Sequence, residues 1–297
     1  MSGGKSRAAP RAVYGWLALL LMLWSANFIF ARFALRELPL EVVLGFRYVF
    51  SAALMLPVMA LGGGQSRVKH PWNWHDLPGL LTIGLLGLVG NQALFVIGIS
   101  MTSVAHAGVI TTLSPVLVLL GSAALGHERI SGARIAGLVT AACGVVVLQF
   151  SRGSAGAATL KGDAVMLASV VVFAAFNLAA KPYAERAGTI RMNAIAYFAA
   201  GAVALPLALW SLNRGAHGSV LAWFGVAYMA AGSSVAGYLI YAYALRHLAA
   251  SRVSVVVYLQ PVVVTLLAIA MLGERPGAWF LPAVGLVLAG VWVVERR

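Results

Sequence analysis

Charged residues are scarce in this 297-residue chain, at 10% of the total, whereas hydrophobic residues make up 61%. A water-soluble protein of this length carries about a quarter charged residues. Such residues cover the surface that faces water, and this chain has too few of them to do so. The composition therefore predicts an integral membrane protein, with the lipid bilayer as its surroundings.

Cysteine is almost absent, because Cys143 is the only one and lies within an apolar run. A single cysteine excludes an intrachain disulfide and a cysteine metal cluster. The apolar runs also offer no nucleophile, metal-ligand set or acid–base pair that facing helices could bring together. We therefore expect no metal ion, no cofactor and no enzymatic activity.

A nucleic-acid-binding surface is missing as well, although the net charge is +13. The 21 Lys and Arg residues occur in ones, twos and threes between apolar runs. They form no basic face and no basic–aromatic pattern, which nucleic-acid binding would need. Short basic loops of this kind set the orientation of membrane helices, so nucleic acid is excluded as a partner.

Ten apolar segments have about the 20 residues that a membrane-spanning helix needs. The predicted spans are 12–33, 40–61, 77–99, 103–125, 132–150, 162–184, 190–212, 219–244, 249–272 and 276–295. The loop-like stretch RGSAGAATLKG lies between the two sets of five. We therefore predict a first five-helix repeat at 1–151, a linker at 152–161 and a second repeat at 162–297.

The orientation of the spans follows from their basic loops. If the N-terminus is cytoplasmic, fourteen Lys and Arg residues lie on the inner side and six on the outer side. The remaining basic residue, Arg47, lies within a span. The count predicts a multi-pass protein with both termini in the cytoplasm.

Carboxylates are missing from the middle of the spans. All eight lie in loops or at predicted helix ends, at Glu37, Glu41, Asp76, Glu128, Asp163, Glu185, Glu274 and Glu295. A proton carrier within a membrane is usually Asp, Glu or His. His106 is the only histidine clearly inside a predicted span. It lies near the outer start of the fourth span, where we interpret it as a membrane-interface residue.

Two stretches of the chain, each within a predicted helix, have similar sequences. SPVLVLLGSAALGHER, at Ser114–Arg129, and QPVVVTLLAIAMLGER, at Gln260–Arg275, share seven of sixteen positions at a constant offset of 146. Because each set contains five spans, an odd number, the second set inserts with the opposite orientation. Inverted repeats of this kind build many secondary transporters. Chance likeness between two apolar helices is the alternative.

Neutral polar and aromatic residues within the spans are candidates for a binding site. The candidates are Trp24, Asn27, Asn91, Gln92, Phe95, Thr111, Ser114, Asn177, Tyr238, Tyr241, Tyr258 and Gln260. Amides beside aromatic rings suit a small solute with a polar head and an apolar body. The same polar residues can instead join helices to one another, and both interpretations stay open.

Two prolines occupy matching positions in the repeated helix. Pro115 and Pro261 cannot donate hydrogen bonds to the carbonyls of Thr111 and Val257, four residues earlier. Freed carbonyls in a membrane must face protein or a water-filled cavity. We predict a hinge at each proline, with a static kink as the alternative.

Two further features bear on packing. Arg47 either pairs with Glu37 or Glu41, which we favour, or meets a carboxylate of the substrate. A stripe of small residues, Gly132, Ala136, Thr140 and Gly144, recurs every four positions in the fifth span. Such a stripe packs a neighbouring helix, either within the protein or in a homodimer.

Several of these motifs together resemble the drug/metabolite transporter superfamily, in its ten-span EamA-type branch. They are Trp24-Ser-Ala-Asn-Phe28, Phe46-Arg47-Tyr48, Ser114-Pro115, Glu128-Arg129, Gln260-Pro261 and Gly273-Glu274-Arg275. The likeness covers nearly the whole chain. One departure is Phe176-Asn177 in the sixth span, where the tryptophan of the first span does not recur.

The resemblance implies a secondary transporter with a central cavity between two inverted five-helix halves. A particular likeness to bacterial exporters of aromatic amino acids implies export of amino acids with aromatic or other apolar side chains across the inner membrane. Efflux of drugs or other metabolites, with proton coupling, is the alternative. Without a carboxylate in mid-membrane we expect facilitated movement, and sodium held by free carbonyls beside Thr111 is not excluded.

Overall fold

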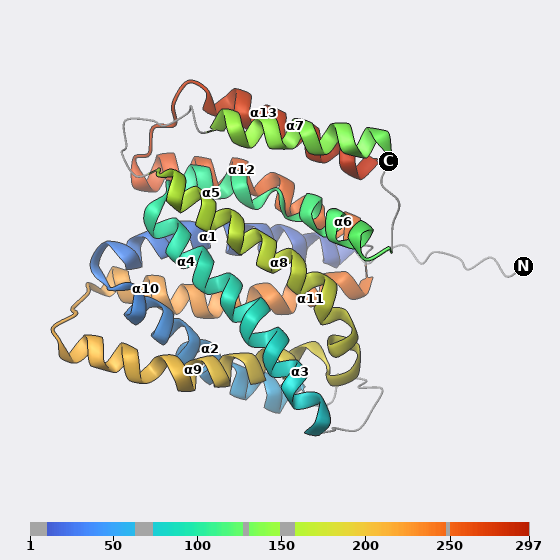
Figure 1. The fold of residues 1–297 in the computed structure, drawn as a ribbon. Helices are drawn as coiled ribbons and strands as arrows, with labels where there is room; N and C mark the ends of the chain where they lie inside the picture. The colour runs from blue at the N-terminus through green and yellow to red at the C-terminus, as the bar shows by residue number, and fades with distance from the viewer. Residues whose placement is uncertain (1–10, 63–73, 127–130, 149–157, 248–249, 297) are drawn as a thin grey trace, which may run out of the picture.

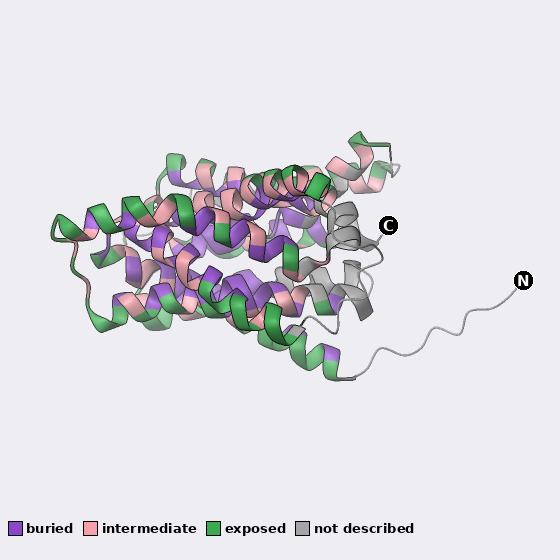
Figure 2. Ribbon diagram, turned by 90° about the horizontal axis from the view of Figure 1, so that it is seen from below, coloured by how far each residue is buried: buried purple, intermediate pink, exposed green. Residues whose placement is uncertain are grey.

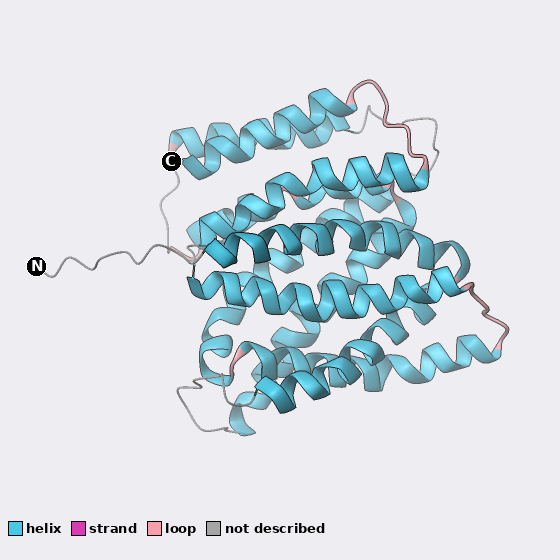
Figure 3. Cartoon of the chain, turned by 180° about the vertical axis from the view of Figure 1, so that it is seen from behind, coloured by secondary structure: helices cyan, strands magenta, loops and turns pink. Residues whose placement is uncertain are grey.

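The computed structural model describes residues 11–62, 74–126, 131–148, 158–247 and 250–296. Within those ranges every regular element is a helix, and Figure 3 shows no strand among them. The predicted all-α class is confirmed. It follows from the surroundings, because in hydrocarbon a helix satisfies its backbone hydrogen bonds within one segment. Glu128, Arg129 and most of the 152–161 linker lie outside the described residues.

The helices of the first half follow the predicted spans. They are α1 Arg11–Glu37, α2 Leu40–Gly62, the short η1 Trp74–Asp76, α3 Leu77–Thr82, η2 Ile83–Val89, α4 Gly90–Met101, α5 Val104–Thr111, α6 Ser114–Ala124 and α7 Gly132–Leu148. The third span is continuous from α3 through η2 to α4, and its central segment η2 is π-helical. The fourth span is divided into α5 and α6.

The second half also follows its five predicted spans, although its fourth span is a single helix. Its helices are α8 Leu160–Ala187, α9 Thr189–Asn213, α10 Val220–Tyr228, η4 Met229–Gly237, α11 Tyr238–His247, α12 Ala250–Leu272 and α13 Phe280–Arg296. The eighth span again contains a π-helical segment, η4, which begins 146 residues after η2. That spacing is the same as the one between the two copies of the proline-bearing helix.

Six helices are long and apolar enough to cross a membrane. They are Ala12–Glu37, Leu40–Leu61, Trp74–Met101, Leu160–Ala179, Ile190–Asn213 and Val220–Tyr241. The other four predicted spans contain apolar helices that are shorter within the described residues, at Val104–Val118, Gly132–Val147, Leu259–Leu272 and Phe280–Val293.

The periphery of the bundle is apolar, as a surface in contact with lipid must be. Large hydrophobic side chains such as Leu86, Val203 and Leu281 are 69%, 78% and 77% exposed. Figure 2 shows exposed residues along the outer sides of the helices and buried ones between them. A soluble protein rarely exposes so extensive an apolar surface, and the described structure therefore agrees with the composition.

The helices pack in a regular set of neighbours. The α2 helix packs against α9, and α7 packs against α13 at one edge of the bundle (Figure 1). The central helix α1 packs against α12 and against α10, η4 and α11. The α8 helix packs against α5 and α6 and against α4 and η2. The cavity described below is bounded by these central helices.

The small residues of α7 form part of its contact with α13. A Cβ atom at Gly144 would lie 2.7 Å from the backbone nitrogen of Val287, so only glycine permits this approach. Ala141 is also buried against α13, but Gly132 and Ala136 are exposed. The packing face therefore includes only one end of the predicted stripe, because the two helices contact each other there.

Candidate functional site

A cavity lies among the central helices, and its empty space, including the part open to solvent, is about 660 Å³. It is lined by Trp24, Asn27, Phe28, Arg47, Asn91, Gln92, Phe95, Thr111, Ser114, Ser169, Val170, Phe173, Ser233, Tyr238 and Gln260. The lining residues come from both halves of the chain, and no carboxylate is among the described ones.

Nine of the twelve predicted binding residues line this cavity. They are Trp24, Asn27, Asn91, Gln92, Phe95, Thr111, Ser114, Tyr238 and Gln260. Spans one, three, four, eight and nine therefore bring their polar and aromatic residues to one place. Span six contributes Ser169, Val170 and Phe173, which were not among the candidates. Ser169 and Phe173 are four residues apart on one helix face, a spacing that could have identified them.

Three predicted binding residues lie elsewhere. Asn177 does not line the cavity, because its Nδ2 donates to the Phe173 carbonyl of its own helix, at 2.8 Å. Tyr241 packs against the ring of Trp24, with ring centroids 5.4 Å apart, and lies behind the lining. Tyr258 is on α12, but its side chain lies outside the described residues.

A buried hydrogen-bond network forms one wall of the cavity. Arg47 Nε donates to Ser234 Oγ at 3.0 Å, and Ser234 Oγ donates to Gln92 Oε1 at 3.2 Å. Gln92 Nε2 donates to the Tyr197 hydroxyl at 2.7 Å, and that hydroxyl donates to the Ser234 carbonyl at 3.2 Å. The network joins α2, α4, α9 and η4, so it fixes the wall in position.

Arg47 does not pair with either acid that the sequence suggested. The Glu41 carboxylate accepts from Ser211 Oγ at 3.1 Å. The Glu37 carboxylate accepts from the backbone nitrogen and hydroxyl of Ser219, at 2.6 and 2.8 Å. The favoured ion-pair interpretation is therefore wrong: both acids lie at helix ends, whereas Arg47 points into the bundle and lines the cavity.

Two amides of the third span serve as helix contacts as well as lining residues. Asn91 Nδ2 donates to the Ser169 carbonyl at 2.8 Å and approaches its hydroxyl at 3.3 Å, which joins α4 to α8. Gln92 belongs to the network around Ser234. The two interpretations of these residues are thus compatible, since one polar group can both join helices and face a ligand.

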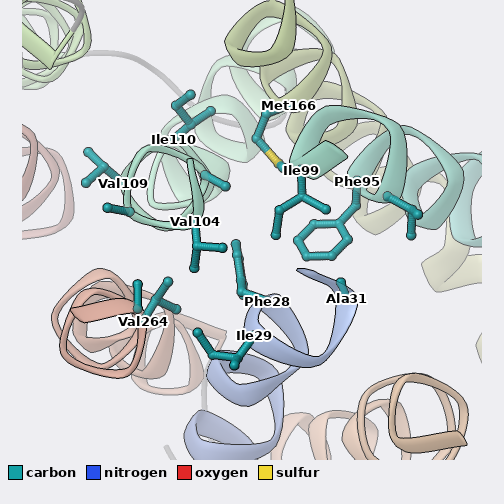
Figure 4. Close-up of a cluster of buried hydrophobic side chains, with 14 of the residues drawn as sticks. Phe28, Ile29, Ala31, Phe95, Ile99, Val104, Val109, Ile110, Met166 and Val264 are labelled. Carbon is teal, nitrogen blue, oxygen red and sulfur yellow. The ribbon is translucent and has the colours of Figure 1, made fainter. Parts of the chain in front are cut away.

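Aromatic rings cover the rest of the cavity. Trp24 meets Tyr238 edge to face, with ring centroids 6.0 Å apart. Phe28 and Phe95 meet edge to face at 4.8 Å, and Figure 4 shows them between α1 and α4. Ile99, Val104 and Met166 surround this pair in the same buried cluster.

His106 is buried beyond this cluster and is not the interface residue that we predicted. It is 3% exposed, and its Nδ1 lies 3.1 Å from Asp163 Oδ2. Thr102 donates a further hydrogen bond to the Asp163 carboxylate. Asp163 lies in the first turn of α8, at a helix end as expected, yet it is only 4% exposed. The sequence did not predict this contact, because His106 and Asp163 are 57 positions apart.

The two predicted hinge prolines occupy different local structures. Pro115 lies in the first turn of α6, directly after the break between α5 and α6. Pro261 is buried inside the continuous helix α12. The second copy of the Glu-Arg motif also has a visible role, because Glu274 accepts from the backbone nitrogens of Val104 and Ala105, at 2.9 and 3.1 Å.

Apolar helices of membrane-spanning length around a cavity lined by amides and rings are typical of a membrane transporter of small molecules. The sequence profile of the EamA-like transporter family matches residues 12–150 and 160–296. The chain therefore belongs to the EamA family, within the drug/metabolite transporter superfamily, and is a transporter rather than an enzyme.

The curated relatives are transporters as well. An uncharacterised transporter of Archaeoglobus fulgidus is 27% identical over 95% of this chain and 98% of its own length. A probable terminal-alkyne amino-acid exporter of Streptantibioticus cattleyicolor is 28% identical over 80% of each chain. An aromatic amino acid exporter of Ancylobacter novellus is 29% identical over 43% of each chain. A solved crystal structure at 22% identity has the same fold, with a TM-score of 0.64 over 95% of this chain and 96% of that one.

Proposed function

We propose that the protein exports amino acids with aromatic or other apolar side chains across the bacterial inner membrane. The observation that carries this proposal is the lining of the cavity. Amide groups and an arginine form its polar part, and Trp24, Phe28, Phe95 and Tyr238 supply rings for an apolar side chain. Two relatives named as amino-acid exporters support the same substrate class.

Alternating access between two inverted halves is the mechanism we propose. The neighbour pattern supports it, because exchanging each span with the one five places later reproduces the most extensive helix contacts. The α4–α8 contact becomes the contact of α1 with α10, η4 and α11, and the contact of α5 and α6 with α8 becomes the α1–α12 contact. A fold with this internal symmetry has two related conformations available.

The chemistry inside the cavity supports facilitated movement. Among its described lining residues there is no Asp, Glu or His that could carry a proton. The buried pair of His106 and Asp163 lies outside the lining. We therefore propose that the amino-acid gradient itself drives export.

The test is counterflow in proteoliposomes. Purified protein is reconstituted in vesicles loaded with one unlabelled amino acid, and entry of a labelled one is followed for a panel of side chains. We expect counterflow for Phe, Tyr, Trp, Leu and Met, with little for Asp or Lys. Transport of drugs or other metabolites without any amino acid would overturn the proposed substrate class.

A further inference from the structure

We infer that Arg47 and Asn27 form the head-group site of this transporter, with the guanidinium binding the carboxylate of the substrate and the amide oxygen accepting from its ammonium group. The inference rests on the proposed function and extends it. It names the chemical groups that a substrate must carry and the two side chains that recognise them.

Arg47 is a buried cation without a protein anion. It is 2% exposed, and within the described residues no carboxylate lies within ion-pair distance of it. Its Nη1 atom has no hydrogen-bond partner. A buried charge is strongly unfavourable unless it is paired and hydrogen-bonded, and an ionisable residue in mid-membrane usually marks a functional pathway. A carboxylate brought by the substrate would compensate this charge.

The guanidinium is held in a fixed orientation. Its Nε donates to Ser234 Oγ, and Ser234 is held in turn by Gln92 and Tyr197. These are neutral groups, so they position the arginine without neutralising it. One edge of the guanidinium is thus used for positioning and a free nitrogen remains. Arginine can then meet a carboxylate with its planar donors, as it does in charge-assisted pairs elsewhere.

Asn27 supplies the complementary group. It lines the same cavity and is 5% exposed, and its Oδ1 atom also has no hydrogen-bond partner. An unpaired acceptor and an unpaired cationic donor in the lining of one cavity match the ammonium and carboxylate of a zwitterion. Both atoms are shielded from water in this conformation. The head group therefore reaches them when the cavity walls rearrange, which alternating access supplies.

The same arrangement predicts which compounds are rejected. A buried guanidinium without a counter-ion repels cationic solutes. An organic amine without a carboxylate would leave Arg47 unpaired and add a second positive charge to the cavity. Cationic drugs are therefore excluded by charge, while the rings of Trp24 and Phe28 tolerate different apolar side chains.

The first experiment needs no variant. Counterflow of labelled L-phenylalanine is measured in proteoliposomes with four competitors: L-phenylalanine, L-phenylalaninamide, phenethylamine and 3-phenylpropionate. We expect the carboxamide and the amine to compete roughly 10- to 100-fold more weakly than the amino acid, because each loses a charge-assisted hydrogen bond. Equal competition by the carboxamide would overturn the inference while leaving amino-acid export intact. Absence of counterflow for every amino acid would instead overturn the proposed function.

Variants then assign the roles of the two residues. Arg47→Gln should raise the half-saturating concentration of L-phenylalanine roughly 10- to 100-fold and abolish the preference over the carboxamide. Arg47→Lys keeps the charge and should restore part of that preference. Asn27→Leu should weaken L-phenylalanine while leaving competition by 3-phenylpropionate unchanged. A preference for the carboxylate that survives Arg47→Gln would overturn the assignment.

The matched control is Arg32→Gln. Arg32 is partly buried and donates to the Thr102 carbonyl at 2.5 Å, but it does not line the cavity. We expect this variant to lose thermal stability and to keep the carboxylate preference. If Arg47→Gln fails to fold, Arg47→Lys tests the assignment of Arg47, and the competition series on the unaltered protein tests recognition of the carboxylate. A loss of preference in Arg32→Gln of the same size would show that the effect comes from general disruption.

Discussion

The two copies of the proline-bearing helix have different shapes. The span that contains the first copy is divided at Thr112 and Leu113 into α5 and α6, whereas the span of the second copy continues through Pro261 as the single helix α12. At the break, Thr112 N and Leu113 N bond to carbonyls three residues earlier, at 3.1 Å each. Proline is common to both copies, so proline alone does not cause the break.

The residues ahead of the proline explain the difference. In the first copy, Thr111 Oγ1 donates to the Gly108 carbonyl at 2.8 Å and Thr112 Oγ1 donates to the Val109 carbonyl at 2.6 Å. Hydroxyl bonds of this kind compete with the helical ladder. The second copy has Val257 and Tyr258 at the matching positions. The threonines therefore stabilise a break that valine and tyrosine do not.

The prediction with the largest expected effect concerns the membrane topology, on which the comparison of the two halves depends. Reporter fusions after Arg297 and in the 62–69 loop should be cytoplasmic, and a fusion at Ala155 should be periplasmic, because basic residues favour the inner side. Alkaline phosphatase activity and fluorescence of a cytoplasmic reporter measure the two cases. A periplasmic C-terminus would remove the inverted relationship on which the comparison depends.

The second prediction concerns the proline that the two copies share. Pro261→Ala restores a donor for the Val257 carbonyl and should stabilise the continuous helix by up to about 3 kcal/mol. Each ~1.4 kcal/mol that favours this conformation lowers the population of the other tenfold. We therefore expect a higher melting temperature together with counterflow slowed by about tenfold or more.

Pro115→Ala is the matched control for that variant. Proline in the first turn of a helix displaces no hydrogen bond, so its replacement should change the melting temperature little. Both prolines should nevertheless affect the transport rate more than the amount of folded protein. Equal losses of folded protein and of activity would reduce them to static kinks.

Composition was enough to predict the helical class, because a chain this apolar has few other solutions in a bilayer. Much of the cavity followed from the rule that polar residues within a span face protein. The partners of Arg47 and His106 did not follow. Arg47 meets Ser234 across 187 positions, and His106 meets Asp163 across 57. Sequence reasoning placed nearby or surface partners there, since it lacked the packing of α2 on η4 and of α5 on α8.

A hydrogen bond that recurs in both halves was also not predicted from the sequence. Tyr48 donates to the Val89 carbonyl in η2 at 3.0 Å, and Tyr197 donates to the Ser234 carbonyl in η4 at 3.2 Å. A tyrosine of the second span of each half thus bonds to a π-helical segment of the third. Periodicity in the sequence does not reveal these π-helical segments, because they are only 7 and 9 residues long and lie within apolar spans.

A third prediction concerns Thr112, which has Tyr258 at the matching position of the second half. Thr112→Val removes a hydroxyl bond at the break and should lower the free energy of unfolding by about 0.5–1.5 kcal/mol. Thr140→Val is the control, since Thr140 makes a comparable bond to the Ala136 carbonyl, at 2.8 Å, within the unbroken helix α7. Thermal unfolding and counterflow are measured for both. Only Thr112→Val should change the transport rate, and an equal change in Thr140→Val would contradict a special role for the break.

The smallest expected effect concerns the buried pair of His106 and Asp163, which joins α5 of the first half to α8 of the second. The pair joins two helices outside the cavity lining, so we assign it to stability rather than to coupling. Counterflow should proceed without a pH or sodium gradient and should be insensitive to a protonophore. His106→Ala and Asp163→Asn should lower the melting temperature, because each removes or weakens a hydrogen bond between buried polar groups. The gradient dependence of transport should stay unchanged in both variants. If an imposed proton gradient drives accumulation in the unaltered protein but not in His106→Ala, the histidine is a proton carrier and the facilitated mechanism is wrong.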